Sequence, residues 1–226
     1  TTLIFLDGIE LPCFAAVHLM RSEDGRRRLV RYFERYIAIA KEARAGFVLE
    51  SPTWRASPDW ADGLGASQRD LDTLNREAIE LLHELRAAHE TPDTPVLVSG
   101  CVGPRGDGYR PDALMSADEA QAYHARQIGV FGTAGVDLVS AITMTHVGEA
   151  VGIARAAQRA GLPVVISFTV ETDGRLPTGE TLKQGIEAVD AATGRGPAYY
   201  MVNCAHPSHF GPALSGGESW VKRIRG

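Results

Sequence analysis

The sequence predicts an α/β fold made of parallel strand–helix units. Short runs rich in apolar and β-branched residues alternate with longer segments whose apolar residues recur every three to four positions. The turns that lead from helix to strand are short, whereas the connections that lead from strand to helix are long. Regular alternation of this kind is typical of a parallel sheet covered by helices.

The elements can be placed one by one along the chain. Apolar, β-branched runs predict strands over Gly46–Glu50, Val96–Cys101, Asp137–Ile142, Pro163–Thr169 and Tyr199–Cys204. Helical spacing predicts helices over Leu29–Ala43, Leu71–Ala88, Ala117–Thr133, Val147–Ala160 and Leu182–Ala191. One helix therefore separates each strand from the next.

The connections differ in a way that favours a barrel. The segments after the first, second, fourth and fifth strands carry the Trp, His, Asp, Tyr and Gly residues typical of sites: Ser51–Ser67, Val102–Ser116, Val170–Glu180 and Ala205–Glu218. In a (β/α)8 TIM barrel the loops after the strands build the active site.

Five strands do not close an eight-stranded barrel, so an open doubly wound sheet is the alternative. No G-x-G-x-x-G follows the first strand, no phosphate-binding G-x-x-x-x-G-K-[ST] occurs, and Gly103–Gly108 is expected to be a plain loop. We therefore predict an incomplete TIM barrel of about five to six β/α units, forming a single domain over residues 1–226.

Composition and charge exclude several classes of protein. The 226 residues carry a net charge of −5, and the basic clusters Arg26–Arg28 and Lys222–Arg225 are expected to be solvated helix faces, so nucleic acid is not a predicted partner. The sequence shows neither an apolar run of about 20 residues nor a signal-peptide pattern, which predicts no membrane association and a cytoplasmic location. Three widely spaced cysteines predict free thiols rather than disulfides.

Cys204 ends the fifth strand and is open to two interpretations. It is either a small buried packing residue, as most free cysteines are, or a thiolate that acts as nucleophile or metal ligand. His206 and His209 follow closely and could complete a Cys/His metal site or simply face solvent. Cys101, flanked by glycines, and Cys13 are interpreted as packing residues.

Four carboxylates are candidates for a base or a ligand. Glu50 lies at the end of its strand, and Asp107, Glu171 and Asp173 lie in the loops after strands. Loop carboxylates also commonly stay solvated or cap the next helix. A Ser-His-Asp site is not supported because the chain has no G-x-S-x-G elbow.

Several motifs, in order along almost the whole chain, resemble those of one family. Glu50–Ser57 is similar to T-x-T-Y-x-A-S, Ser99–Gly106 to G-S-x-G-P-x-G, Pro163–Thr169 with Gly174–Leu176 to an I-S-F-T and G-R-L pair, and Val202–Cys204 to V-N-C. Together they resemble the homocysteine S-methyltransferase family, zinc-dependent barrels that move a methyl group onto a thiol.

The resemblance implies a transferase of methionine biosynthesis. Its substrates would be a small methyl donor and a thiol acceptor such as homocysteine, and a homo-oligomer is compatible with it. The resemblance implies that Cys204 is a zinc ligand and that Ser51, Thr53, Thr143 and Asn203 contact the substrate. Bound zinc would lower the pKa of the acceptor thiol and hold it as a thiolate.

The chain also departs from the family pattern. The opening D-G-G strand and the closing G-G-C-C strand, with two further zinc thiolates, are not found, so we expect a chain truncated at both ends, its remaining zinc ligands beyond Gly226 and its zinc weak or absent. Ile142 stands where the family has a Glu that binds the substrate amino group, which leaves the acceptor open. The alternative function is a divergent, catalytically inactive barrel that binds a small ligand, with Cys204 in its core.

Overall fold

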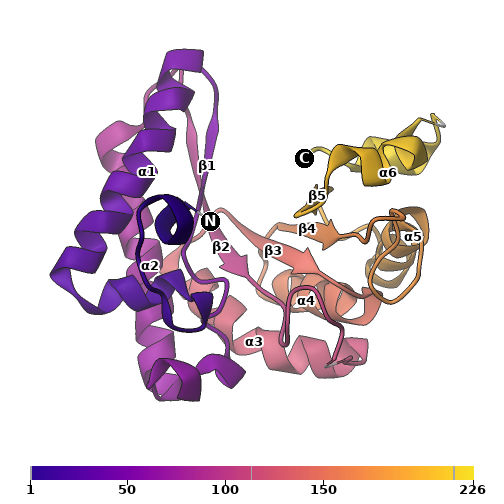
Figure 1. Ribbon diagram of the computed structural model, residues 1–226, viewed down its shortest axis with the longest axis horizontal. Helices are drawn as coiled ribbons and strands as arrows, with labels where there is room; N and C mark the ends of the chain where they lie inside the picture. The colour runs from indigo at the N-terminus through magenta and orange to yellow at the C-terminus, as the bar shows by residue number, and fades with distance from the viewer. Residues whose placement is uncertain (1, 113, 216) are drawn as a thin grey trace. The chain divides into compact units, whose positions relative to one another are not determined.

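A computed structural model describes residues 2–112, 114–215 and 217–226 (Figure 1). The chain divides into two compact units. The first unit holds the residues up to Cys101 together with Val130–Leu138, and the second unit holds Val102–Gly129 and Val139–Gly226. That both belong to a single domain over residues 1–226 stays a prediction.

The first unit contains two parallel strands and two long helices. Helix α1 (Glu23–Ala43) precedes β1 (Phe47–Glu50), and helix α2 (Gln68–His89) precedes β2 (Val96–Val102), whose last residue belongs to the second unit. β1 pairs with β2 in register from Phe47 opposite Val96 to Glu50 opposite Ser99. Shorter helical turns cover Thr2–Leu6, Pro12–Phe14, Ala16–Arg21, Pro58–Trp60 and Asp62–Leu64.

Local chemistry sets where these helices begin. The side chain of Ser22 accepts the Gly25 N–H at the start of α1, and Ser67 and Asp70 form a reciprocal capping box at the start of α2. Apolar side chains at helical spacing then face the core of the unit, where Leu29, Ile37, Ile79 and Leu82 are buried with Leu49 of β1 and Val98 of β2.

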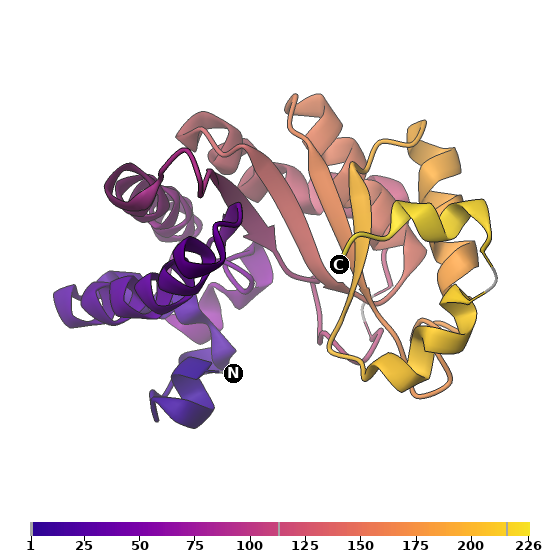
Figure 2. The ribbon, with the colours of Figure 1, turned by 90° about the horizontal axis from the view of Figure 1, so that it is seen from above.

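The second unit contains three parallel strands. Its elements are most of α3 (Ala117–Ala134), β3 (Leu138–Met144), α4 (Val147–Arg159), β4 (Val164–Thr169), α5 (Leu182–Thr193), β5 (Tyr199–Asn203), α6 (Pro207–Leu214) and a 3₁₀ turn (Ser219–Arg223). β3 pairs with β4 and β4 with β5, side by side as Figure 2 shows. The register of β3 shifts between Ala141 and Met144, which marks a β-bulge.

Helices cover this part of the sheet. α4 packs against β4 and against α5, and all six residues of β4 are buried. The rings of Phe168 and Tyr200 stack with centroids 6.2 Å apart between β4 and β5. Burial on both faces explains why the strand sequences are almost continuously apolar.

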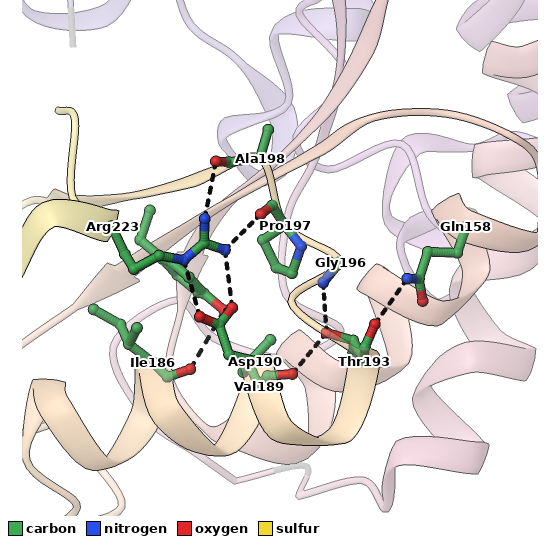
Figure 3. Close-up of polar contacts among 10 residues, drawn as sticks. Gln158, Ile186, Val189, Asp190, Thr193, Gly196, Pro197, Ala198 and Arg223 are labelled. Atoms are coloured by element: carbon green, nitrogen blue, oxygen red, sulfur yellow. Dashed lines mark hydrogen bonds and ion pairs between the residues drawn. The ribbon is translucent and has the colours of Figure 1, made fainter. Parts of the chain in front are cut away.

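The last described residues run along β5. Ile224 forms a parallel bridge with Tyr200, Arg225 N–H donates to the Tyr200 carbonyl at 2.9 Å, and Val202 N–H donates to the Gly226 carbonyl at 3.1 Å. Arg223 fixes this segment, because its Nε and Nη2 each lie 2.9 Å from a carboxylate oxygen of Asp190 on α5 (Figure 3).

The same guanidinium also donates to two backbone carbonyls just before β5. Arg223 Nη2 lies 2.6 Å from the oxygen of Pro197, and Nη1 lies 3.2 Å from that of Ala198 (Figure 3). The Tyr200 hydroxyl donates to Asp190 Oδ1 at 2.8 Å, so the carboxylate receives three hydrogen bonds. Burial and the neighbouring Asp190 carboxylate raise the pKa of the Tyr200 hydroxyl far above its usual value.

The predicted strands and helices are confirmed, with bounds that differ by a few residues at most ends. Among the described residues, the short helical turns were not predicted, and neither was helix α6, which lies where residues 205–218 were expected to form a loop. Pro207 stands at the first helical position, where its fixed φ favours a helix and its missing N–H costs nothing. Among the residues described, no helix combines the length and apolar character needed to cross a membrane; the cytoplasmic location stays a prediction.

Candidate functional site

The side chain of Asn203 joins the three strands of the second unit near their carboxyl ends. Its Oδ1 accepts hydrogen bonds from Thr143 N–H at 3.0 Å and from Ser167 Oγ at 2.6 Å, and its Nδ2 donates to Thr143 Oγ1 at 2.9 Å. Thr143 lies in the bulge of β3 with a φ of 70°. β-Branched residues rarely adopt this conformation, and such strain concentrates at functional sites. Asn203 therefore satisfies the N–H of a strained residue and brings two predicted site residues together.

Cys204 follows Asn203 directly and is exposed. Its φ of 55° places it in the left-handed region, which ends β5 abruptly. The interpretation of Cys204 as a buried packing residue is therefore wrong. Cys101 is buried as expected, and burial raises the pKa of its thiol well above the ordinary value, with the nearby Glu50 adding to the shift.

A catalytic zinc is typically held by three protein ligands. Within residues 2–112, 114–215 and 217–226, no three His, Cys, Asp or Glu side chains come together in a way that could hold a metal ion. The residues around Cys204 in this chain therefore do not fit a catalytic zinc, and we derive no chemical step through one.

Of the two histidines after Cys204, His206 lies at the start of α6 and His209 lies within the helix. His206 is the N-cap of that helix, and its Nδ1 accepts the Ser208 N–H at 3.3 Å and lies 2.7 Å from Ser208 Oγ. The rings of His206 and His209 have centroids 5.9 Å apart. The structure thus gives His206 a local capping function, and the described residues contain no Cys204/His206/His209 metal site.

The predicted site residues of the first unit form a compact polar group. Ser51 Oγ and Thr53 Oγ1 are buried and lie 2.6 Å apart. Ser51 Oγ accepts the Cys101 N–H at 2.9 Å, and Thr53 Oγ1 donates to the Cys101 carbonyl at 2.8 Å. These hydroxyls hold the end of β2 against the end of β1, so a role in substrate contact rests on the family resemblance.

Two of the candidate loop carboxylates cap turns. Asp107 Oδ1 accepts the N–H groups of Tyr109 and Arg110 at 2.8 and 3.2 Å, and Asp173 Oδ1 accepts the Arg175 N–H at 3.0 Å. Short Asp side chains commonly stabilise turns in this way. The geometry gives them a structural task, which was the second interpretation of these residues.

A buried ionisable cluster in the second unit was not predicted. Glu149 on α4 and His124 on α3 have side chains only 2% and 0% exposed, and His124 Nε2 lies 2.8 Å from Glu149 Oε1. His146 Nε2 lies 3.5 Å from Glu149 Oε2, at the limit of a hydrogen bond. His124 Nδ1 has no partner among the described residues, which fits a ring that carries its proton on Nε2.

The charge of Glu149 depends on these neighbours. Burial alone would raise the pKa of its carboxyl. The contact with His124, the nearby His146 ring and the hydrogen bond from the Arg105 N–H outweigh that effect and lower the pKa to about 2. A sequence signal for this cluster did exist, because His124 lies four residues from the buried Ala120 and Ile128 on the apolar face of α3.

The family model for homocysteine S-methyltransferase matches residues 16–222. Because the match covers most of the chain, the protein belongs to the homocysteine S-methyltransferase family, a family of methyltransferase enzymes. A comparison with curated protein sequences finds no match.

Three solved structures of the homocysteine methyltransferase MmuM from Escherichia coli have a similar fold. The metallated form has a TM-score of 0.75 at 20% identity over 94% of this chain and 75% of that one. The oxidized form gives 0.76 at 21% identity, covering 94% and 74%. The apo form gives 0.69 at 20% identity, covering 94% and 72%. The predicted fold class, an incomplete TIM barrel, is confirmed.

Proposed function

We propose that the protein transfers a methyl group from a small donor to the sulfur of a thiol acceptor such as homocysteine, at the carboxyl end of its parallel strands. The family match over residues 16–222 supports the reaction class. The strained bulge at Thr143, held by Asn203 next to the exposed Cys204, is the observation that supports this location.

The reaction class defines what such a site must do. The acceptor sulfur donates an electron pair to the methyl carbon while the bond from that carbon to the donor breaks, and the donor leaves with that pair. The thiol must first lose its proton to solvent or a base, because the thiolate is the nucleophile and a free thiol has a pKa of about 8.5. Holding donor and acceptor in line supplies much of the remaining rate enhancement.

In this proposal, Asn203 and Thr143 contact substrate at the strand ends of the second unit, and substrate contact by Ser51 and Thr53 is proposed on the family resemblance alone. Cys204 is proposed as a metal ligand on the family resemblance, which gives it partner thiolates that the described residues do not bring to it. The described chain carries no three-ligand cluster, so we expect little or no zinc in it after dialysis. Elemental analysis giving about one tightly bound zinc per chain would contradict this expectation.

The test of the function uses the full gene product with homocysteine and other thiols, each combined with a panel of sulfonium methyl donors. Mass spectrometry should detect the methylated thioether. Cys204→Ser should lose metal and activity together. Cys13→Ser is the matched control, because Cys13 is also a free cysteine with a left-handed backbone, φ 53° against 55° for Cys204. Retention of both properties in Cys204→Ser would exclude it as a ligand.

A second candidate is a catalytically inactive barrel that binds a small ligand. Ile142, in place of a carboxylate that could pair with an ammonium group, is the observation that favours it. This candidate predicts thiol binding by calorimetry without any thioether product. The exposed thiol of Cys204 removes the part of this hypothesis that placed the residue in the core.

A further inference from the structure

The Glu149 carboxylate makes a further hydrogen bond besides its contact with His124. Its Oε1 also accepts the backbone N–H of Arg105 at 2.8 Å, and Arg105 belongs to the long connection that follows β2. The carboxylate therefore ties together α3, α4 and this loop, all within the second unit.

The loop is fastened to the same helices by its side chains and by close packing. The Arg105 guanidinium lies over the Tyr123 ring of α3, 4.8 Å from its centroid, and that ring meets the His124 ring edge-on at 4.8 Å. At the other end of the loop, the Met115 carbonyl lies so close to Gly148 that an added Cβ would stand 2.4 Å from its oxygen. The first turn of α4 is thus built to receive the loop.

Burying an ionised carboxylate between two helices costs free energy, because the charge loses its hydration. Apolar side chains of similar volume would serve packing alone as well or better. A carboxylate offers several acceptor positions in one place, so it can take a backbone N–H and an imidazole N–H at once. In this structure the Glu149 carboxylate accepts one loop amide, the Arg105 N–H, in addition to its histidine contact. This arrangement indicates that the charge serves to hold the loop in position.

We propose that Glu149 is a positioning residue that fixes the loop over residues 103–112 at the carboxyl end of β2, acting through the Arg105 N–H and oriented by His124. The loop follows the carboxyl end of a strand, where the loops of a barrel build the active site, so its effect on catalysis rests on the proposed function. The positioning itself does not.

The first test measures the hydrogen-exchange rate of the Arg105 backbone amide in the 226-residue protein. In the wild type this amide should exchange far more slowly than its loop neighbours at residues 106–108. Glu149→Gln should speed its exchange by at least about tenfold while the urea-unfolding transition stays cooperative. A neutral amide oxygen is a weaker acceptor than the charged Oε1 that takes both the Arg105 N–H and the His124 contact, and the amide has no second acceptor oxygen to face His146.

Glu119→Gln is the matched control. Glu119 accepts the Ser116 N–H at 2.9 Å near the other end of the loop, but its carboxylate is exposed. Its substitution should leave exchange at Arg105 unchanged. An Arg105 amide that exchanges as fast as its neighbours in the wild type, or equally fast in Glu149→Gln and wild type, would overturn the proposal even if the variant folds poorly.

The second readout is kinetic. In the full gene product, Glu149→Gln should raise KM about three- to tenfold with kcat within about twofold, because a displaced loop weakens substrate binding more than chemistry. Unchanged KM despite faster Arg105 exchange would refute the catalytic part. Absence of methyl transfer in the wild type would refute the proposed function while leaving the exchange result to decide the positioning.

Discussion

The contact between Arg223 and Asp190 leads to a prediction about stability. The two side chains are only 15% and 12% exposed, and Arg223 makes four hydrogen bonds, two to the carboxylate and two to backbone carbonyls. Removing one partner of a buried pair costs about 3–5 kcal/mol. Because Asp190 keeps its hydrogen bond from Tyr200 and some solvent, we expect Arg223→Ala to lower the free energy of unfolding by roughly 2–4 kcal/mol.

Arg155→Ala supplies the matched control for the loss of an arginine. Arg155 Nη1 lies 3.1 Å from Asp118 Oδ1, but the Asp118 side chain is 90% exposed, and exposed pairs contribute about 0–1 kcal/mol. Urea unfolding followed by circular dichroism gives both values. A double-mutant cycle with Asp190→Ala should return a coupling of about 1–3 kcal/mol. A loss in Arg223→Ala no larger than that in Arg155→Ala would refute the reasoning.

Three further predictions address other parts of the molecule. The pKa of the Glu149 carboxyl is about 2 in the folded chain against an ordinary 4.5, so its charge adds roughly 3 kcal/mol of stability above pH 4.5 that is lost as pH falls toward 2. The free energy of urea unfolding should therefore depend less on pH between 5 and 2.5 in Glu149→Gln than in the wild type. An equal pH dependence in the two proteins would contradict this. Gly100→Ala should destabilise the chain by about 1–3 kcal/mol, because the new Cβ would stand 2.4 Å from the Phe131 ring. Gly129→Ala on α3 should stabilise it by about 0.5–1 kcal/mol, because the new Cβ has no heavy atom within 4 Å. Shifts of the thermal unfolding midpoint in the same direction for both variants would show the argument to be wrong. Asn203→Ala should cost about 1–3 kcal/mol, because it leaves the N–H of Thr143 without its acceptor, and an unchanged unfolding midpoint in urea would count against it.

The sequence predicted the strands well because each is a short, largely apolar run. Val164–Thr169 is buried at every position, so its pattern could not be mistaken for a surface helix. Cys204 and Asn203 could be identified as candidates because they belong to a motif of consecutive residues at the end of a strand. The sequence predicted where these two residues lie in the chain, but not the hydrogen bonds of Asn203 or the left-handed backbone of Cys204.

The rest depends on contacts between residues far apart in the chain. The left-handed backbone of Thr143 is stabilised by Asn203, 60 positions later, which accepts its N–H and donates to its hydroxyl. Glu149, in the first turn of its helix, resembles an ordinary acidic residue that favours the helix dipole, and only the fold brings His124 to it across 25 positions. Tertiary partners of this kind leave little trace in local composition.

The short segment that runs beside β5 occupies backbone groups of that strand. The open edge of a β-sheet presents unpaired N–H and C=O groups that can recruit a strand from another molecule. Here the N–H of Val202 and the carbonyl of Tyr200 are already taken by Gly226 and Arg225. Because Arg223 holds that segment in place, its loss would free two backbone groups of β5 for hydrogen bonding to another strand.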